Sequence, residues 1–193
     1  MFGVGCLKFL AMLKYLVILF LLVNLVSTAA VDGFSQEYTH AHCEMHIAPE
    51  LDELDPRRIH GQIHMKQSAR GGPVDVLVNL TGFDVTSQER NHAFHIHVYG
   101  DLSDGCKNLG RSYDNADEDK TDIEHLGTTG NFGNITRDDT GSVVTSFTNN
   151  RITLKGRHSV FGRSIVVHAL PYTDGSKGSA GIHIACCVIG RSE

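Results

Sequence analysis

The sequence has little positive charge, no internal repeat and little helical periodicity. Its 17 lysines and arginines are outnumbered by 22 aspartates and glutamates, which gives a formal net charge of −5. Nucleic acids and anionic membranes are bound by basic surfaces that displace counterions, so we expect neither as a partner. The 193 residues, 41% of them hydrophobic, fit one ordinary globular domain rather than a disordered or multi-domain chain.

Long apolar runs are also scarce, and the one that could matter for a membrane lies at residues 15–26. Lys8 and Lys14 precede it, and small residues follow it at 27–30. This order is typical of a secretory signal peptide. The alternative, a single-span anchor, is disfavoured because a bilayer requires about 20 apolar residues. We therefore predict a signal peptide at 1–29, a secreted domain at 30–193 without a further membrane span, and a mature net charge of −7 after loss of the two lysines.

Where helical periodicity is missing, alternation of period two is common. Apolar and polar residues alternate in four segments, 41–47, 58–66, 74–80 and 92–99. Shorter strand-like segments follow at 134–137, 142–147, 163–169 and 182–189. Eight short strands separated by Gly- and Asp-rich turns predict an all-β sandwich or barrel. The connection at 101–130 has few large apolar residues, and connections of this length are usually functional or disordered.

Four cysteines remain once Cys6 leaves with the signal peptide, namely Cys43, Cys106, Cys186 and Cys187. An even number in a secreted chain indicates two disulfides. Adjacent residues of a strand point to opposite faces, so Cys186 and Cys187 should bond to different partners. The spacing leaves open which of them takes Cys43 and which takes Cys106.

Histidine is the clear excess, with 12 residues, and it is both a proton switch near neutral pH and the commonest metal ligand. His95 and His97 stand two residues apart in a predicted strand, so both imidazoles should share one face about 6.5 to 7 Å apart. That spacing suits two ligands of one metal ion. His168 ends a distant apolar strand and is the candidate third ligand. A polar strand face without metal is the alternative interpretation.

A second set of histidines lies on the outward faces of the first two predicted strands: His40, His42, His46, His60 and His64. If these strands pair antiparallel, the imidazoles form a cross-strand patch with neighbours about 5 Å apart. Such a patch can bind zinc, copper or another divalent cation, or link subunits through a metal. A solvated strand face is the alternative. The carboxylates at 114–124 lack the EF-hand spacing, which favours a solvated loop over a calcium site.

Several motifs together resemble the signatures of the copper/zinc superoxide dismutase family. In chain order they are His-Ala-Phe-His-Ile-His-Val-Tyr-Gly-Asp at 92–101, Gly105-Cys106, Gly133-Asn134, Gly-Arg-Ser-Ile-Val-Val-His at 162–168 and Ala-Cys-Cys-Val-Ile-Gly at 185–190. The resemblance covers nearly the whole predicted mature chain. The paired cysteines near the C-terminus and the cysteine of the first strand are most similar to the extracellular branch.

This resemblance implies a fold, a disulfide scheme and a ligand set. The fold is an antiparallel Greek-key barrel of eight strands. The disulfides would join Cys106 to Cys186 and Cys43 to Cys187. The family's copper ligands fall on His95, His97 and His168.

Other family positions carry different residues here. The histidine that bridges copper to zinc falls on Ser112, and a serine hydroxyl is a poor copper ligand. Two zinc ligands fall on Asn131 and Thr128, with His125 as a substitute only if its loop shifts. The arginine that guides superoxide falls on His183, although only a guanidinium is charged at every accessible pH. We therefore expect copper binding without the family's zinc site, and little or no dismutase activity.

An acidic, histidine-rich, secreted chain with these substitutions is also similar to the bivalve haemolymph proteins of the cavortin, dominin and pernin group. That similarity implies metal binding or transport in extracellular fluid, assembly into a homo-oligomer, and a role in defence or shell mineral. One alternative is an active extracellular copper-dependent dismutase. The other is an assembly or defence-recognition module in which metal is incidental.

Two Asn-X-Thr acceptors for glycosylation occur in the predicted secreted domain, at Asn79 and Asn134. Asn79 has the parity of an outward-facing strand residue and is the predicted glycosylation site. Asn134 falls at a tight turn, where access is restricted. His92 and His158 are expected to be structural hydrogen-bonding residues rather than ligands.

Overall fold

The computed structural model describes residues 15–18, 20, 37–51, 53–115, 129–173 and 180–193. The chain divides into two units, Met1–Gln36 and Glu37–Glu193. In the first unit, residues 15–18 are helical. None of the helices formed by the described residues is long and apolar enough to cross a membrane. The signal peptide at 1–29 remains a prediction.

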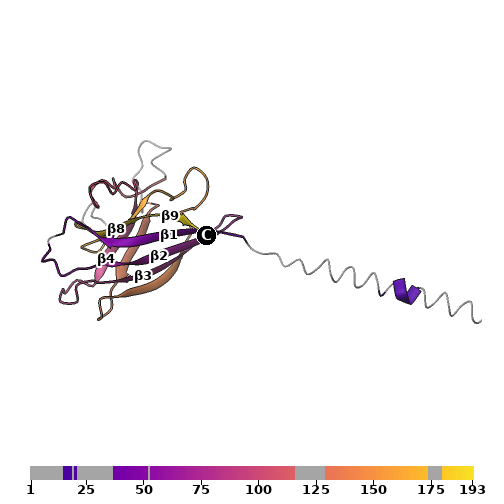
Figure 1. Ribbon diagram of the computed structural model, residues 1–193, viewed down its shortest axis with the longest axis horizontal. Helices are drawn as coiled ribbons and strands as arrows, with labels where there is room; N and C mark the ends of the chain where they lie inside the picture. The colour runs from indigo at the N-terminus through magenta and orange to yellow at the C-terminus, as the bar shows by residue number, and fades with distance from the viewer. Residues whose placement is uncertain (1–14, 19, 21–36, 52, 116–128, 174–179) are drawn as a thin grey trace, which may run out of the picture. The chain divides into compact units, whose positions relative to one another are not determined.

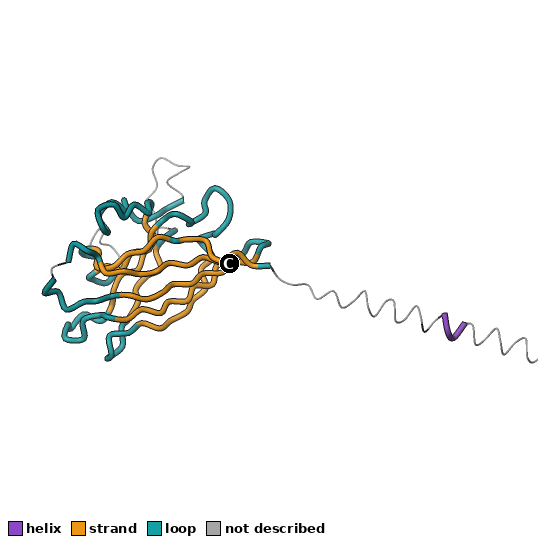
Figure 2. Tube along the Cα trace, viewed as in Figure 1, coloured by secondary structure: helices purple, strands orange, loops and turns teal. Residues whose placement is uncertain are grey.

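The second unit is built from strands, which Figure 2 shows in orange. The strands are β1 (Tyr38–Ile47), β2 (His60–Ser68), β3 (Val74–Thr81), β4 (Asn91–His97), β5 (Asn131–Thr136), β6 (Val143–Asn149), β7 (Ser164–His168), β8 (His183–Val188) and β9 (Gly190–Ser192). The first eight correspond to the eight strands that the sequence predicts.

The strands form one antiparallel sheet in the order β5-β4-β7-β8-β1-β2-β3-β6, and β9 pairs with β1. β1, β2 and β3 lie side by side in Figure 1. The outermost strands of this order, β5 and β6, contact each other, so the sheet nearly closes into a barrel. The predicted eight-stranded antiparallel barrel is confirmed.

The C-terminal end differs from the prediction of one strand at 182–189. Ile189 leaves the ladder because its backbone exchanges hydrogen bonds with the turn before β7, from Ile189 N to Arg163 O and from Gly162 N to Ile189 O, each 2.9 Å. The chain then forms β9, which pairs with β1 from His40 to His42.

Two apolar clusters lie on opposite faces of β7 and β8. The larger one fills the barrel and includes Ile165, Val167 and Cys187. The smaller one consists of Ala48, Cys106, Leu109, Val166 and Cys186. Each fully buried aliphatic side chain contributes about 1.5 to 3 kcal/mol by leaving water. The smaller cluster therefore holds the connection after β4 against the outside of the barrel. Cys106 and Leu109 are enough for this, although the connection contains few large apolar residues.

The disulfides are Cys43–Cys187 and Cys106–Cys186. The first joins β1 to β8 inside the larger cluster, and the second joins the connection after β4 to β8 inside the smaller one. The expectation that Cys186 and Cys187 take different partners on opposite faces is confirmed. The pairing implied by the family resemblance is also the one observed.

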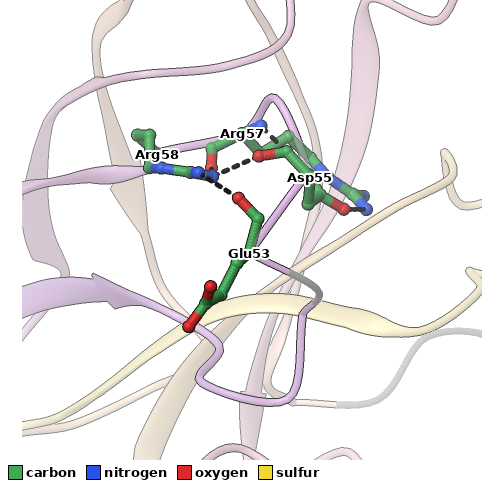
Figure 3. A network of polar contacts seen from close by, with 4 residues as sticks. All are labelled: Glu53, Asp55, Arg57 and Arg58. Carbon is green, nitrogen blue, oxygen red and sulfur yellow. Dashed lines mark hydrogen bonds and ion pairs between the residues drawn. The ribbon is translucent and has the colours of Figure 1, made fainter.

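The connection between β1 and β2 is held by a network of polar contacts (Figure 3). The Arg57 guanidinium forms an ion pair with the Asp55 carboxylate and holds the pKa of that carboxyl below its usual range. Arg58 donates from Nη2 to the backbone oxygen of Glu53 at 2.8 Å. These contacts fold the connection back on itself just before β2 begins.

Candidate metal centre

Three imidazoles meet on the outer face of the barrel, where β4 pairs with β7. His95 and His97 belong to β4, and His168 is the last residue of β7. One ring nitrogen from each lies within 4.8 Å of the other two, and each residue is at most 6% exposed. The three histidines predicted from strand parity and from the family resemblance therefore come together.

The strand pairing is irregular at two of these positions. The β4–β5 ladder shifts register between Ala93 and His95, and the β7–β8 ladder shifts between Val167 and His168. Such irregularities bend a strand and redirect its side chains, and they are frequent beside functional sites. Backbone geometry thus helps to aim His95 and His168.

Backbone carbonyls orient two of the rings. His97 donates from Nδ1 to Gly110 O at 2.9 Å, and His168 donates from Nδ1 to Gly181 O at 3.4 Å. A carbonyl oxygen only accepts, so each Nε2 is the available ligand atom. Gly110 has a φ of +72°, and a Cβ there would lie 2.8 Å from the Tyr99 ring. A residue with a Cβ at 110 would therefore strain the backbone that carries the carbonyl orienting His97.

The resulting geometry fits a bound metal ion. The Nε2 atoms of His97 and His168 lie 3.3 Å apart. Two nitrogens bound at about 2.0 to 2.1 Å to one tetrahedral ion lie about 3.3 Å from each other. His95 Nε2 is buried, and among the described residues it has no hydrogen-bond partner. Imidazole nitrogens suit copper and zinc, so these three residues fit such an ion.

Burial also keeps the three rings neutral. Loss of water contact lowers the pKa of His95 and of His97 to about 4, and that of His168 to about 3. Repulsion from the neighbouring imidazoles adds to the lowering, whereas a hydrogen bond with the Asn131 side chain opposes it at His95. A neutral imidazole keeps the lone pair that a metal requires.

Ser112 lies opposite His97. The two residues form an isolated antiparallel bridge, and the neighbouring backbone hydrogen bond from Val98 N to Arg111 O measures 3.0 Å. Directly opposite residues of an antiparallel pair project to the same face. Ser112 thus occupies the place beside the cluster where the family resemblance puts the bridging histidine.

His183 lies closer to the cluster than the sequence indicated. Its ring centroid is 4.8 Å from that of His97 and 4.9 Å from that of His168, with the ring planes nearly perpendicular. Its Nδ1 donates to Cys106 O at 2.6 Å. Sequence reasoning assigned His183 only to the anion-guiding position and gave no sign that it would contact two of the ligand rings. Tyr172, whose ring centroid lies 5.7 Å from that of His95, was also missed.

The family's zinc positions are only partly visible. Asn131 begins β5, and its side-chain oxygen accepts a hydrogen bond from Gly133 N at 2.7 Å. His125, Thr128 and most of the acidic stretch lie outside the described residues. Within the described ranges, the three-histidine cluster is the one group of three or more His, Cys, Asp or Glu residues close enough to share an ion.

Of the five outward histidines, two are in ring contact. His42 and His64 are directly opposite on β1 and β2, with ring centroids 4.7 Å apart. His40 lies opposite Lys66, and His46 lies opposite Cys186 of β8. The predicted five-membered patch is thus reduced to a central pair, because β1 passes from β2 to β8 along its length. His60, at the start of β2, lies opposite Thr81 of β3 and donates to Arg58 O at 2.7 Å.

The remaining predicted positions also have defined surroundings. Asn79 is exposed on β3. Asn134 is exposed too, but its side chain donates to Tyr172 O at 3.0 Å and accepts from Tyr172 N at 2.6 Å. His92 is buried and donates to His168 O at 3.0 Å, as expected of a structural histidine. His158 Nε2 accepts a hydrogen bond from Arg157.

Comparisons with known proteins agree with this architecture. The sequence profile described as copper/zinc superoxide dismutase (SODC) matches residues 59–189. A rabbit (Oryctolagus cuniculus) protein named extracellular superoxide dismutase (Cu-Zn) is 31% identical over 87% of this chain and 69% of its own length. The namesake from Drosophila melanogaster is 36% identical over 72% of this chain and 79% of its own. That from Homo sapiens is 33% identical over 78% of this chain and 63% of its own.

Proposed function

The chain belongs to the copper/zinc superoxide dismutase family, and on that premise we propose that it is an extracellular metal-binding protein with little or no dismutase activity. It retains the three-histidine cluster of His95, His97 and His168 as a metal pocket. The role that this pocket serves is metal binding or transport in extracellular fluid.

The observation that carries the proposal is the position of Ser112 directly opposite His97. A metal ion in the cluster would be bound by three imidazoles. The Ser112 hydroxyl stands where a fourth ligand is expected. A neutral hydroxyl binds copper poorly and cannot link two metals as an imidazolate does. Binding at the cluster would therefore be weaker than at a four-histidine site, and independent of zinc.

The surroundings of the pocket support low activity. Copper, when bound, would supply the one-electron chemistry of dismutation. Dismutation also requires that the protein draw the superoxide anion inward, and a guanidinium does this better than an imidazole. His183 stands at that position with Nδ1 occupied by Cys106 O. The chain's net negative charge further opposes steering of an anion.

Secretion is part of the proposal. The named relatives are extracellular proteins, and both disulfides fit an oxidising compartment. Removal of residues 1–29 would release the domain at 30–193. Assembly into a homo-oligomer is proposed with it, to be checked by the mass of the purified protein in solution.

The second candidate is an active copper-dependent dismutase, favoured by the intact cluster and by the enzyme names of the relatives. Metal analysis of the purified native protein, together with a dismutase assay after copper loading, separates the two functions. The metal-binding proposal expects copper bound through His95 and His97 and a rate near that of free solution chemistry. A copper-loaded protein with a rate approaching diffusion control would overturn it in favour of the enzyme.

A further inference from the structure

A pair of histidines on the outside of the barrel is separate from the three-histidine cluster. His42 of β1 and His64 of β2 are cross-strand neighbours, and both side chains are accessible to solvent. Their Nδ1 atoms face each other at 3.5 Å. The strands that carry them, β1 and β2, lie side by side in Figure 1.

The hydrogen bonds of this pair favour one tautomer of each ring. His42 Nε2 lies 3.2 Å from a carboxylate oxygen of Glu44, and His64 Nε2 lies 3.3 Å from the amide oxygen of Gln62. Both oxygens only accept hydrogen bonds, so each Nε2 carries the proton. In the neutral rings each Nδ1 then carries a lone pair, and a gap of 3.5 Å separates the two nitrogens.

We propose that this gap is a second metal site, in which Nδ1 of His42 and Nδ1 of His64 bind one Zn²⁺ or Cu²⁺ ion. Two lone pairs at 3.5 Å repel each other unless a cation lies between them. Two ligands of a tetrahedral zinc ion lie about 3.3 Å apart, so the side chains need to move by only a few tenths of an ångström. Imidazole is a preferred ligand of both metals.

The surroundings provide what a two-histidine site needs. Glu44 accepts from the far nitrogen of His42, the carboxylate–histidine–metal arrangement that fixes a ring and raises its basicity. The nearby cation, Lys66, lies 3.9 Å from the Asp75 carboxylate, which offsets its charge. His40 and His64 both line a groove of about 410 Å³ between β1, β2, β3 and β6. The pair itself is exposed to solvent, so water can complete the coordination.

Zinc binding to the folded protein tests the site, with Zn²⁺ alone as the probe in equilibrium dialysis at pH 7.5. We expect the double variant His42→Gln/His64→Gln to bind one zinc ion fewer per chain than the unmodified protein. His46→Gln, an exposed histidine on the same strand, is the matched control and should bind the unmodified number. Glu44→Gln keeps both ligands and should weaken the affinity of this site for zinc by roughly 10- to 100-fold.

A second double variant distinguishes the two metal sites. His95→Gln/His97→Gln should lose the cluster's ion and keep the one at His42 and His64. The inference is overturned if the His42/His64 variant binds as much zinc as the unmodified protein, or if His46→Gln loses the same ion. A protein that binds no metal at the cluster but keeps the surface ion would refute the proposed function and leave this inference intact.

Discussion

His183 donates a hydrogen bond to the backbone oxygen of Cys106 over 2.6 Å and packs its ring against His97 and His168. This contact joins β8 to the connection that carries Ser112, so the two substituted family positions are parts of one local structure. Restoring the family residues at both positions is therefore more informative than restoring either one.

We predict that Ser112→His with His183→Arg raises copper affinity by roughly 10- to 100-fold, a range that even outer contacts to a metal ligand produce. The added imidazole supplies a fourth ligand to copper, and the guanidinium attracts the superoxide anion. Copper competition titrations measure the first effect. The dismutase rate should also rise and should fall again with ionic strength, because steering is screened by salt.

Ser112→Ala combined with His183→Arg is the control for this experiment, because it restores the charge without the ligand. It should leave copper affinity near that of the unmodified protein. If the histidine-containing variant changes neither affinity nor rate, Ser112 does not stand at the bridging position.

The two disulfides should have separable effects. Cys106→Ser/Cys186→Ser releases the connection that holds the Gly110 carbonyl against His97, so metal affinity should fall. Cys43→Ala/Cys187→Ala removes a link between residues 144 positions apart and should lower the free energy of unfolding by about 2 to 5 kcal/mol, with affinity of the folded protein unchanged. Denaturant titration and metal titration of both variants check this. Equal loss of affinity in the two would contradict it.

Alternation of period two predicted β1, β2 and β3 well, because these strands bury every second residue. It is absent from the burial of β7, which is covered on both faces, and that strand was predicted from its short apolar run instead. Alternation was not enough for β9, since Gly190–Ser192 is too short to carry a pattern and pairs through backbone atoms alone. The cluster was predictable because His95 and His97 share parity on one strand. His168 was a candidate because it ends an apolar strand, and the family resemblance assigned it to the same site.

Parity gives the face of a strand but not its register or its neighbours. That is why five outward histidines were expected in one patch, whereas only His42 and His64 are in ring contact. His46 shares their parity, but β1 has passed to β8 at that point. The contacts of His183 with His97 and His168 depend on how β4, β7 and β8 stack around the barrel, which no local pattern encodes.

The metal-free protein should lose stability as the pH falls from about 6.5 toward 4. Burial lowers the pKa of His95 and His97 to about 4 and that of His168 to about 3, from 6.5. Between these values the unfolded chain binds protons that the folded chain does not, so acid favours unfolding. Each histidine contributes a slope of about 1.4 kcal/mol per pH unit.

Denaturant unfolding of the metal-free protein at pH 7, 6 and 5 measures this slope. His168→Gln should lower this slope by about 1.4 kcal/mol per pH unit, since one proton-binding group is gone. A free energy of unfolding that is flat over this range, or a slope that His168→Gln leaves unchanged, would contradict the assignment of the three buried neutral rings.

Glycosylation should be confined to Asn79. Its side chain is exposed on β3. Both polar side-chain atoms of Asn134, in contrast, are hydrogen-bonded to the backbone of Tyr172. Mass spectrometry of the protein secreted from eukaryotic cells should show one glycan, which Asn79→Gln removes and Asn134→Gln does not. A glycan on Asn134 would require that its contact with Tyr172 be broken.

The register shifts beside His95 and His168 are properties of the backbone ladders. Ser112 belongs to the connection after β4, so a substitution there leaves these two ladders in place and the metal-binding rings keep their orientation. The three-histidine pocket therefore does not depend on a histidine at position 112. For a protein engineer, the barrel is a scaffold in which the fourth ligand position can be varied while the three-histidine pocket is kept.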